Sequence, residues 1–91
     1  MGVIKLPSGG SPIKSIQRGT ASMGTSVNSV NVTISSVDTT KTFIVISSSF
    51  NATNASEGLV RAFLTNATTV TLTRGATGAS VNIDWQVIEY V

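Results

Sequence analysis

The chain has 91 residues, of which 41% are hydrophobic and 11% are charged; its net charge is +2, and it contains neither cysteine nor histidine. This composition excludes disulfides, thiolate or imidazole metal ligands, and catalysis that depends on either residue type. A chain this short forms one domain and buries only about 60–65% of its unfolded surface. Because a surface with few charges associates readily, we expect copies of the chain to cover part of it, as a homotrimer or larger assembly.

The basic residues do not form a run or a patch, so the sequence disfavours a nucleic-acid partner. No stretch approaches the length of a transmembrane helix, and the first residues lack the apolar region of a signal peptide. We therefore expect a protein made in the cytoplasm without a secretion signal and without a membrane partner.

Residues 1–12 predict an extended N-terminal arm, because Pro7, Gly9, Gly10 and Pro12 interrupt any regular element. The large aliphatic side chains of this arm are Val3, Ile4 and Leu6. We expect these three residues to attach the domain to a neighbour, with backbone of the arm added to a neighbouring sheet edge. The folded domain is predicted to span residues 13–91.

The rest of the chain predicts strands separated by polar turns. Alternation of apolar and polar residues, or short apolar runs, indicates six strands at 13–19, 30–35, 42–47, 59–66, 69–74 and 79–91. Residues 20–29 and 48–58 are predicted to be loops. In the turn at 37–40, Asp38 is expected to accept a hydrogen bond from its own downstream backbone.

The fourth segment, 59–66, has apolar spacing that also fits a short helix. We favour a strand, because 69–74 follows closely and pairs naturally with it as a hairpin across Asn66, Ala67 and Thr68. Six strands and no convincing helix predict an all-β domain, a single antiparallel β-sandwich or jelly-roll-like fold.

The last segment is the one around which the others are arranged. Every second residue from 81 to 87 is apolar and polar residues lie between them, which predicts a strand with one buried face. We expect it to be the central strand. Its partners in the core are predicted from residue type, and the expected core contains Phe43, Phe63, Trp85 and Val87, together with Val32, Ile34 and Leu72.

The acidic residues do not suggest an enzyme or a cofactor site. The four of them, Asp38, Glu57, Asp84 and Glu89, have no histidine or cysteine to work with, and their positions do not predict a facing pair. Glu89 shares a strand face with Trp85, which leaves two interpretations. Either the strand end is solvated, or Arg18 or Arg61 forms a fixed ion pair with Glu89.

Four segments carry a resemblance to known proteins: IQRG (16–19), VTISSVDTTKTFIVISSS (32–49), VRAFLTNATTVTLTR (60–74) and WQVIEYV (85–91). Their overall pattern, over residues 13–91, resembles a group of small proteins of tailed bacteriophages. Such proteins are β-rich, often trimeric virion components. The strand arrangement is also similar to the H-type lectin-like sandwiches of phage adhesins, whose sugar-binding residues are not recognisable here.

The resemblance implies a virion protein made in the host bacterium. The small size, low charge and N-terminal arm favour a capsid decoration or cement protein on the head surface, bound to the major capsid protein or another virion protein. The alternative is a tail-fibre or tail-tip module that binds a host-surface glycan. The hydroxyl-rich loops favour this alternative, and Phe50, beside a polar loop, is the aromatic residue placed for it.

Overall fold

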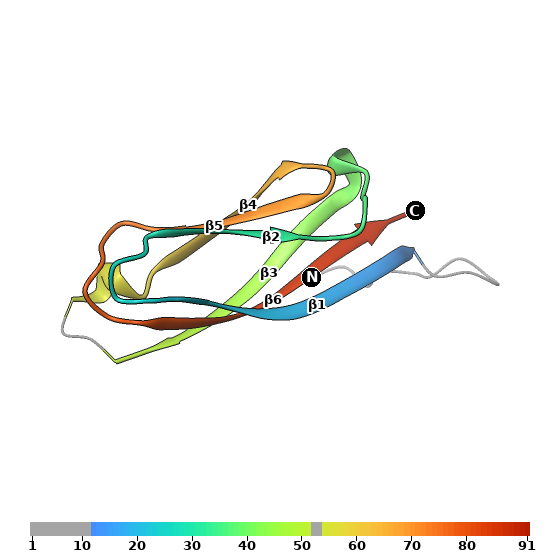
Figure 1. Cartoon of the computed structure of the whole chain (residues 1–91). Helices are drawn as coiled ribbons and strands as arrows, with labels where there is room; N and C mark the ends of the chain where they lie inside the picture. Colours follow the sequence, from blue (N-terminus) through green and yellow to red (C-terminus); the bar gives the residue numbers. More distant parts are fainter. Residues whose placement is uncertain (1–11, 52–53) are drawn as a thin grey trace.

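Two three-stranded antiparallel sheets pack face to face in the computed structural model, which describes residues 12–51 and 54–91 (Figure 1). Sheet A has the strand order β1 (Ile13–Met23), β6 (Val81–Tyr90), β3 (Thr42–Phe50), and sheet B the order β2 (Ser29–Thr33), β5 (Thr69–Arg74), β4 (Val60–Asn66). Two single-turn 3-10 helices, η1 (Thr39–Lys41) and η2 (Ala55–Glu57), lie in the connections. The predicted all-β sandwich is confirmed.

Strand β6 is the middle strand of sheet A, as its alternating sequence predicted, and it pairs with β1 on one side and β3 on the other. Its apolar residues Val81, Ile83, Trp85 and Val87 are all buried between the sheets. The residues between them lie on the outer face of sheet A, because side chains alternate along a strand.

The hairpin predicted at 59–74 is confirmed, since β4 and β5 pair antiparallel. Asn66 closes its turn: the side-chain oxygen Oδ1 accepts a hydrogen bond from the backbone N–H of Thr68 at 2.9 Å. Such a side-chain bond two residues along the chain stabilises a turn against a helix.

Two strands are longer than their sequences predicted. β1 continues to Met23 through residues that we expected to form a loop, and β3 continues to Phe50. The extensions contain small polar residues such as Ser22 and Ser49. Both lie opposite Asn82 on β6, so pairing with the central strand, rather than local propensity, sets their length.

The core is aliphatic apart from one tryptophan. The buried cluster consists of Met23, Ile34, Val37, Val70, Leu72, Val81, Ile83, Trp85 and Val87, and Val32 packs against it half-buried. Trp85 and Val87 were expected there, but the placement of Phe43 and Phe63 in the core was wrong. Phe43 is 40% exposed and Phe63 37% exposed, because their registers opposite Ile88 and Thr71 put them on the outer faces.

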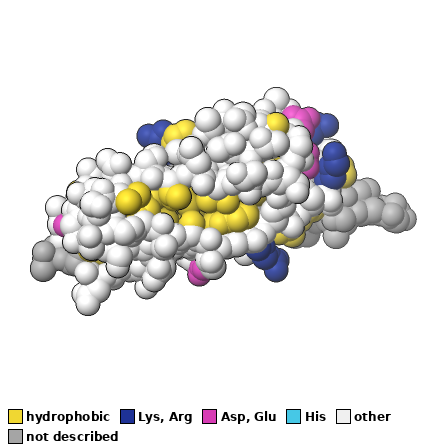
Figure 2. All heavy atoms as spheres, viewed as in Figure 1, with side chains coloured by type: hydrophobic (Ala, Val, Ile, Leu, Met, Phe, Trp, Pro, Cys, Tyr) yellow, Lys and Arg dark blue, Asp and Glu magenta, His cyan; other side chains and the backbone are white. Residues whose placement is uncertain are grey.

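The sandwich is open along its lateral edges. Strands β1 and β3 are the edges of sheet A, and β2 and β4 are the edges of sheet B. Figure 2 shows a band of hydrophobic atoms at the surface between the positions of β1 and β2. The half-buried residues that pack on the core from these two strands are Ala21, Val30 and Val32. A three-over-three sandwich therefore does not cover its own core completely.

Candidate association surface

Arg74 closes one end of the sandwich from the inside. It follows Val70 and Leu72 at every second position of β5, so its side chain points between the sheets, and it is 5% exposed. The guanidinium donates to four backbone oxygens: Nε and Nη2 to Val27 (3.0 and 2.7 Å), Nη2 to Gly24 (2.8 Å), and Nη1 to Glu57 and Ala79 (2.7 and 2.6 Å). All five N–H donors are used. One side chain thus ties together the three loops of this end.

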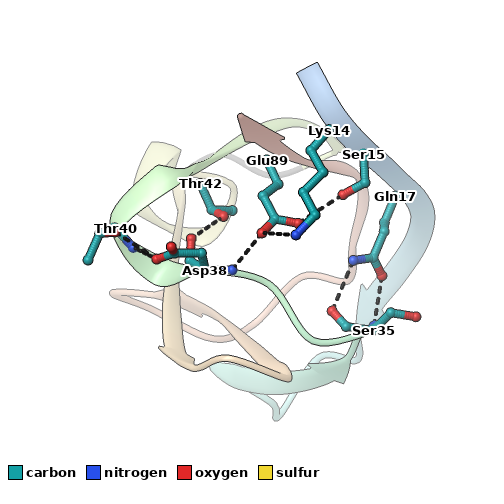
Figure 3. Close-up of polar contacts among 8 residues, drawn as sticks. All are labelled: Lys14, Ser15, Gln17, Ser35, Asp38, Thr40, Thr42 and Glu89. Carbon is teal, nitrogen blue, oxygen red and sulfur yellow. Dashed lines mark hydrogen bonds and ion pairs between the residues drawn. The ribbon is translucent and has the colours of Figure 1, made fainter. Parts of the chain in front are cut away.

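Glu89 is the buried charge at the opposite end, and it is 3% exposed. Its Oε2 accepts from the backbone N–H of Asp38 at 2.8 Å, and its Oε1 accepts from the Ser15 hydroxyl at 3.2 Å (Figure 3). The Lys14 Nζ lies 3.8 Å from Oε2 and is mostly exposed. Both interpretations of the sequence were therefore wrong: the strand end is not solvated, and the ion-pair partner is Lys14.

The expected partners of Glu89 lie elsewhere. Arg18 is opposite Gln86 on the outer face of sheet A. Arg61 is on the outer face of sheet B, with its guanidinium carbon 5.1 Å from the centre of the Phe63 ring. Lys14 reaches Glu89 because the β1–β6 register shifts between Ile13 and Ser15 and takes Lys14 out of the regular alternation.

The connection from β2 to β3 is fixed at the Glu89 end by side chains of sheet A and by its own Asp38. Gln17 on β1 makes two hydrogen bonds to the backbone of Ser35, one to its carbonyl (3.0 Å) and one from its N–H (2.8 Å) (Figure 3). Asp38 then begins η1: its Oδ1 accepts from the backbone N–H of Thr40 at 2.9 Å and from the Thr40 hydroxyl at 2.6 Å. The turn contact predicted for Asp38 is confirmed.

These contacts predict how Asp38 titrates. The Thr40 hydroxyl, and after it the Thr40 backbone N–H, holds the pKa of Asp38 below its ordinary value of 3.8. A lowered pKa stabilises the fold above the unfolded value, and this contribution is lost as the pH falls through the folded pKa. In Thr40→Ala the pKa of Asp38 is expected to rise toward 3.8, as measured by NMR titration of its carboxyl carbon. Thr39→Ala is the matched control, and equal midpoints in the two variants would contradict the assignment.

The four acidic residues serve different parts of the fold. Asp38 begins η1, Glu57 ends η2, Asp84 is on the outer face of sheet A, and Glu89 is enclosed between the sheets. Within residues 12–51 and 54–91, no three histidine, cysteine or acidic residues come together in a way that could hold a metal ion. In the same part of the chain no helix is long and apolar enough to cross a membrane.

The outer face of sheet A carries an exposed group of large apolar side chains at the Glu89 end. Ile16, Ile88 and Phe43 form one row across the three strands, and Tyr90 and Val45 lie on either side of this row. The rings of Phe43 and Tyr90 are in contact, with centroids 5.5 Å apart. Ile88 is half-buried and the other four are 40–47% exposed. We call these five residues the apolar face.

A shallow depression adjoins the apolar face toward the middle of sheet A. Its volume is about 380 Å³, and its walls include Arg18, Thr20, Val45, Ser47, Asp84 and Gln86. Val45 belongs to both the depression and the apolar face. The outer side of sheet A therefore changes along the strands from an apolar surface to a polar hollow.

The outer face of sheet B is different in chemistry. Thr69, Thr71 and Thr73 alternate along β5 on this side, and the Thr71 hydroxyl bonds Asn31 at 2.9 Å and also the Thr65 hydroxyl. Phe63 is the exposed aromatic ring of this hydroxyl-rich surface. Sheet A thus has an outer surface suited to apolar contact, and sheet B one suited to hydrogen bonding.

Comparison with models of known protein families, with curated proteins and with solved structures finds no match to the chain. We therefore infer the function from the surfaces described above. Residues 42–47 are apolar on both strand faces, but sequence reasoning did not identify the outer side as an exposed apolar face. The expected attachment residues Val3, Ile4 and Leu6 lie outside the described residues.

Proposed function

We propose that the protein is a structural, non-enzymatic component of a bacteriophage virion, a decoration or cement protein of the head, and that it joins the particle through its apolar face. The observation that carries this proposal is the apolar face itself. The resemblance of four sequence segments to small phage proteins supports the bacteriophage setting. The partner is the major capsid protein or another virion protein, in contact with a homotrimer of the domain.

The apolar face fits such a contact because its side chains are large and contiguous. The rings of Phe43 and Tyr90 are in contact, and Ile16 continues the row of Phe43 on the other side of β6. Aromatic residues carry much of the binding energy of protein interfaces. A stable contact buries roughly 1,200–2,000 Å² in total. The apolar face and the adjoining depression together provide a centre and a polar rim for a contact of this kind.

A second candidate is a tail-fibre or tail-tip protein that binds a host-surface glycan. The observation that favours it is Phe63, exposed among the hydroxyl groups of the outer face of sheet B. An aromatic ring stacks on the apolar side of a sugar, and the neighbouring hydroxyls hydrogen-bond to it. This surface is on the opposite side of the molecule from the apolar face.

The copy number in purified virions tests the proposal and separates the two candidates. Quantitative mass spectrometry is expected to find hundreds of copies per particle for a head protein, whereas a few to a few dozen would indicate a tail protein. The variant Val45→Glu is expected to lower incorporation at least tenfold, because a carboxylate at a buried contact is costly.

The control for this variant is Thr33→Glu, at an exposed position on the outer face of sheet B, which should be incorporated normally. Particles that contain no copies would overturn the proposed function. Equal incorporation of the two variants would overturn the role of the apolar face.

A further inference from the structure

We infer that residues 3–6 of the chain's own N-terminal arm cover the apolar face in the free protein, and that the virion partner displaces them on assembly. The first half concerns the isolated protein. The second half deepens the proposed function and rests on it. The occupant is identified from the place where the arm begins, its length and its sequence.

The arm begins at the rim of the apolar face. The backbone N–H of Val91 donates to the carbonyl oxygen of Pro12 at 2.9 Å, which holds the start of the folded domain beside the end of β6. Tyr90, the outermost member of the apolar face, immediately precedes Val91. Figure 1 shows the C-terminus next to the first residues of β1. Any segment that precedes Pro12 therefore starts within a few ångströms of the apolar face.

The arm is long enough to turn back over this face. Leu6 precedes Pro12 by six positions, and an extended chain of that length spans up to about 20 Å. Along β6, Ile88 and Gln86 are two and four residues from Tyr90, or about 7 and 13 Å. Even if half of the connecting length is used in a reversal, Leu6 reaches the row of Ile88. Gly9 and Gly10 lie between, and glycine allows the backbone conformations that a tight reversal requires.

The composition of the arm matches the surface. Val3, Ile4 and Leu6 are its large aliphatic residues, and the apolar face offers aliphatic and aromatic side chains without a charge among them. In an extended segment Ile4 and Leu6 point to one side, while Lys5 points to the other, toward water. The segment therefore has one apolar side for the apolar face and one polar side for water.

The covalent connection between the arm and the domain favours the chain's own arm, rather than the arm of another copy, as the occupant of the apolar face. A short flexible connection gives an effective concentration in the millimolar range, about a thousandfold above a micromolar protein solution. Among separate chains in solution, the intramolecular contact therefore forms first. The contact buries few apolar side chains, and it must order several backbone residues, which costs conformational entropy. It is therefore weak enough for a larger partner surface to displace.

The absence of cysteine from the chain allows a direct test. Ile4→Cys is combined with Val45→Cys, or with Ile16→Cys, in one full-length chain, and disulfide formation under mild oxidation is followed by mass spectrometry. We expect an intrachain disulfide at a rate independent of protein concentration from 1 to 100 µM. Ile4→Cys combined with Thr33→Cys, on the outer face of sheet B, is the matched control and should react at least tenfold more slowly.

Two outcomes would overturn the inference. Equal rates for the apolar-face pairs and the control pair would show that the arm has no preferred position. Rapid disulfide-linked dimers in a mixture of the Ile4→Cys and Val45→Cys single variants would assign the face to the arm of a second copy. If cross-linking fails but virions contain hundreds of copies, the proposed function stands and the inference about the arm falls. If cross-linking succeeds but virions contain no copies, the proposed function and the displacement by a virion partner fall, and the cover of the apolar face in the free protein stands.

Discussion

Arg74→Met is expected to lower the free energy of unfolding by about 3–5 kcal/mol, because it removes a fully hydrogen-bonded buried group. The replacement leaves the carbonyl oxygens of Gly24, Val27, Glu57 and Ala79 without their donor. A buried carbonyl without a partner costs about 1–3 kcal/mol, less where water reaches it. Equilibrium unfolding in urea, monitored by the fluorescence of the single tryptophan, measures the change.

The matched control for this variant is Arg61→Met. Arg61 is exposed and contacts the Phe63 ring, a contact worth about 0.5–1 kcal/mol at an exposed site. Arg74→Lys should fall between wild type and Arg74→Met, since an ammonium group has three donors where the guanidinium has five. If Arg74→Met loses no more stability than Arg61→Met, the three loops at this end do not depend on the guanidinium.

Trp85→Ala is expected to cost about 3–5 kcal/mol, the range for large core residues replaced by alanine. Native proteins have about 5–15 kcal/mol in total, so this variant should lose a large fraction of its stability. The indole lies over Gly19, its neighbour on β1, where an added Cβ would collide with ring atoms Cζ2 and Cε2. The Trp85 ring therefore fills the space that a side chain at position 19 would occupy.

Thermal denaturation followed by far-ultraviolet circular dichroism tests this prediction. Phe43→Ala is the control, because Phe43 is an aromatic residue of sheet A that lies on the outer face; it should change stability by less than about 1 kcal/mol. Trp85→Phe, which retains part of the packing, should be intermediate and remain folded. A Trp85→Ala protein that melts within a degree or two of wild type would show that β6 does not organise the core.

The sequence predicted those parts of the fold where a local pattern and the tertiary structure agree. The alternation in residues 81–87 predicted the central strand, and residues 59–74 predicted the hairpin. Asp38 was also predicted correctly, because a side-chain contact two residues along the chain is local. Such signals need no knowledge of which strands are neighbours.

The remaining parts depend on register. Whether Phe43 and Phe63 face inward is set by the residues opposite them on β6 and β5, and residue type alone predicted the wrong side. The partner of Glu89 depends on the register shift at Lys14, which a single strand's sequence does not show. Arg74 could have been found, since it continues the inward series of Val70 and Leu72.

The candidate surface was only half predicted. Residues 42–47 are apolar on both faces, which indicates a strand covered on both sides, and the inner side is covered by sheet B. The cover of the outer side is not supplied by any element among the described residues, so neither periodicity nor propensity could identify it. We could propose the N-terminal arm as this cover only because the structure places the start of β1 beside Tyr90.

The position of β6 in sheet A also has a consequence for how the chain acquires its structure. The middle strand of this sheet is the last to be synthesised, and it pairs with the first strand: Ile16 lies opposite Ile88, 72 residues later. Closing so long a loop before any pairing is gained is entropically costly, so folding is expected to be slow, in the millisecond-to-second range of all-β domains. The β4–β5 hairpin can form early because it is local. A chain that ends before residue 81 leaves β1 and β3 with no strand between them. Sheet A can therefore form only in a chain synthesised through β6, and products that end before this strand should be removed by proteolysis.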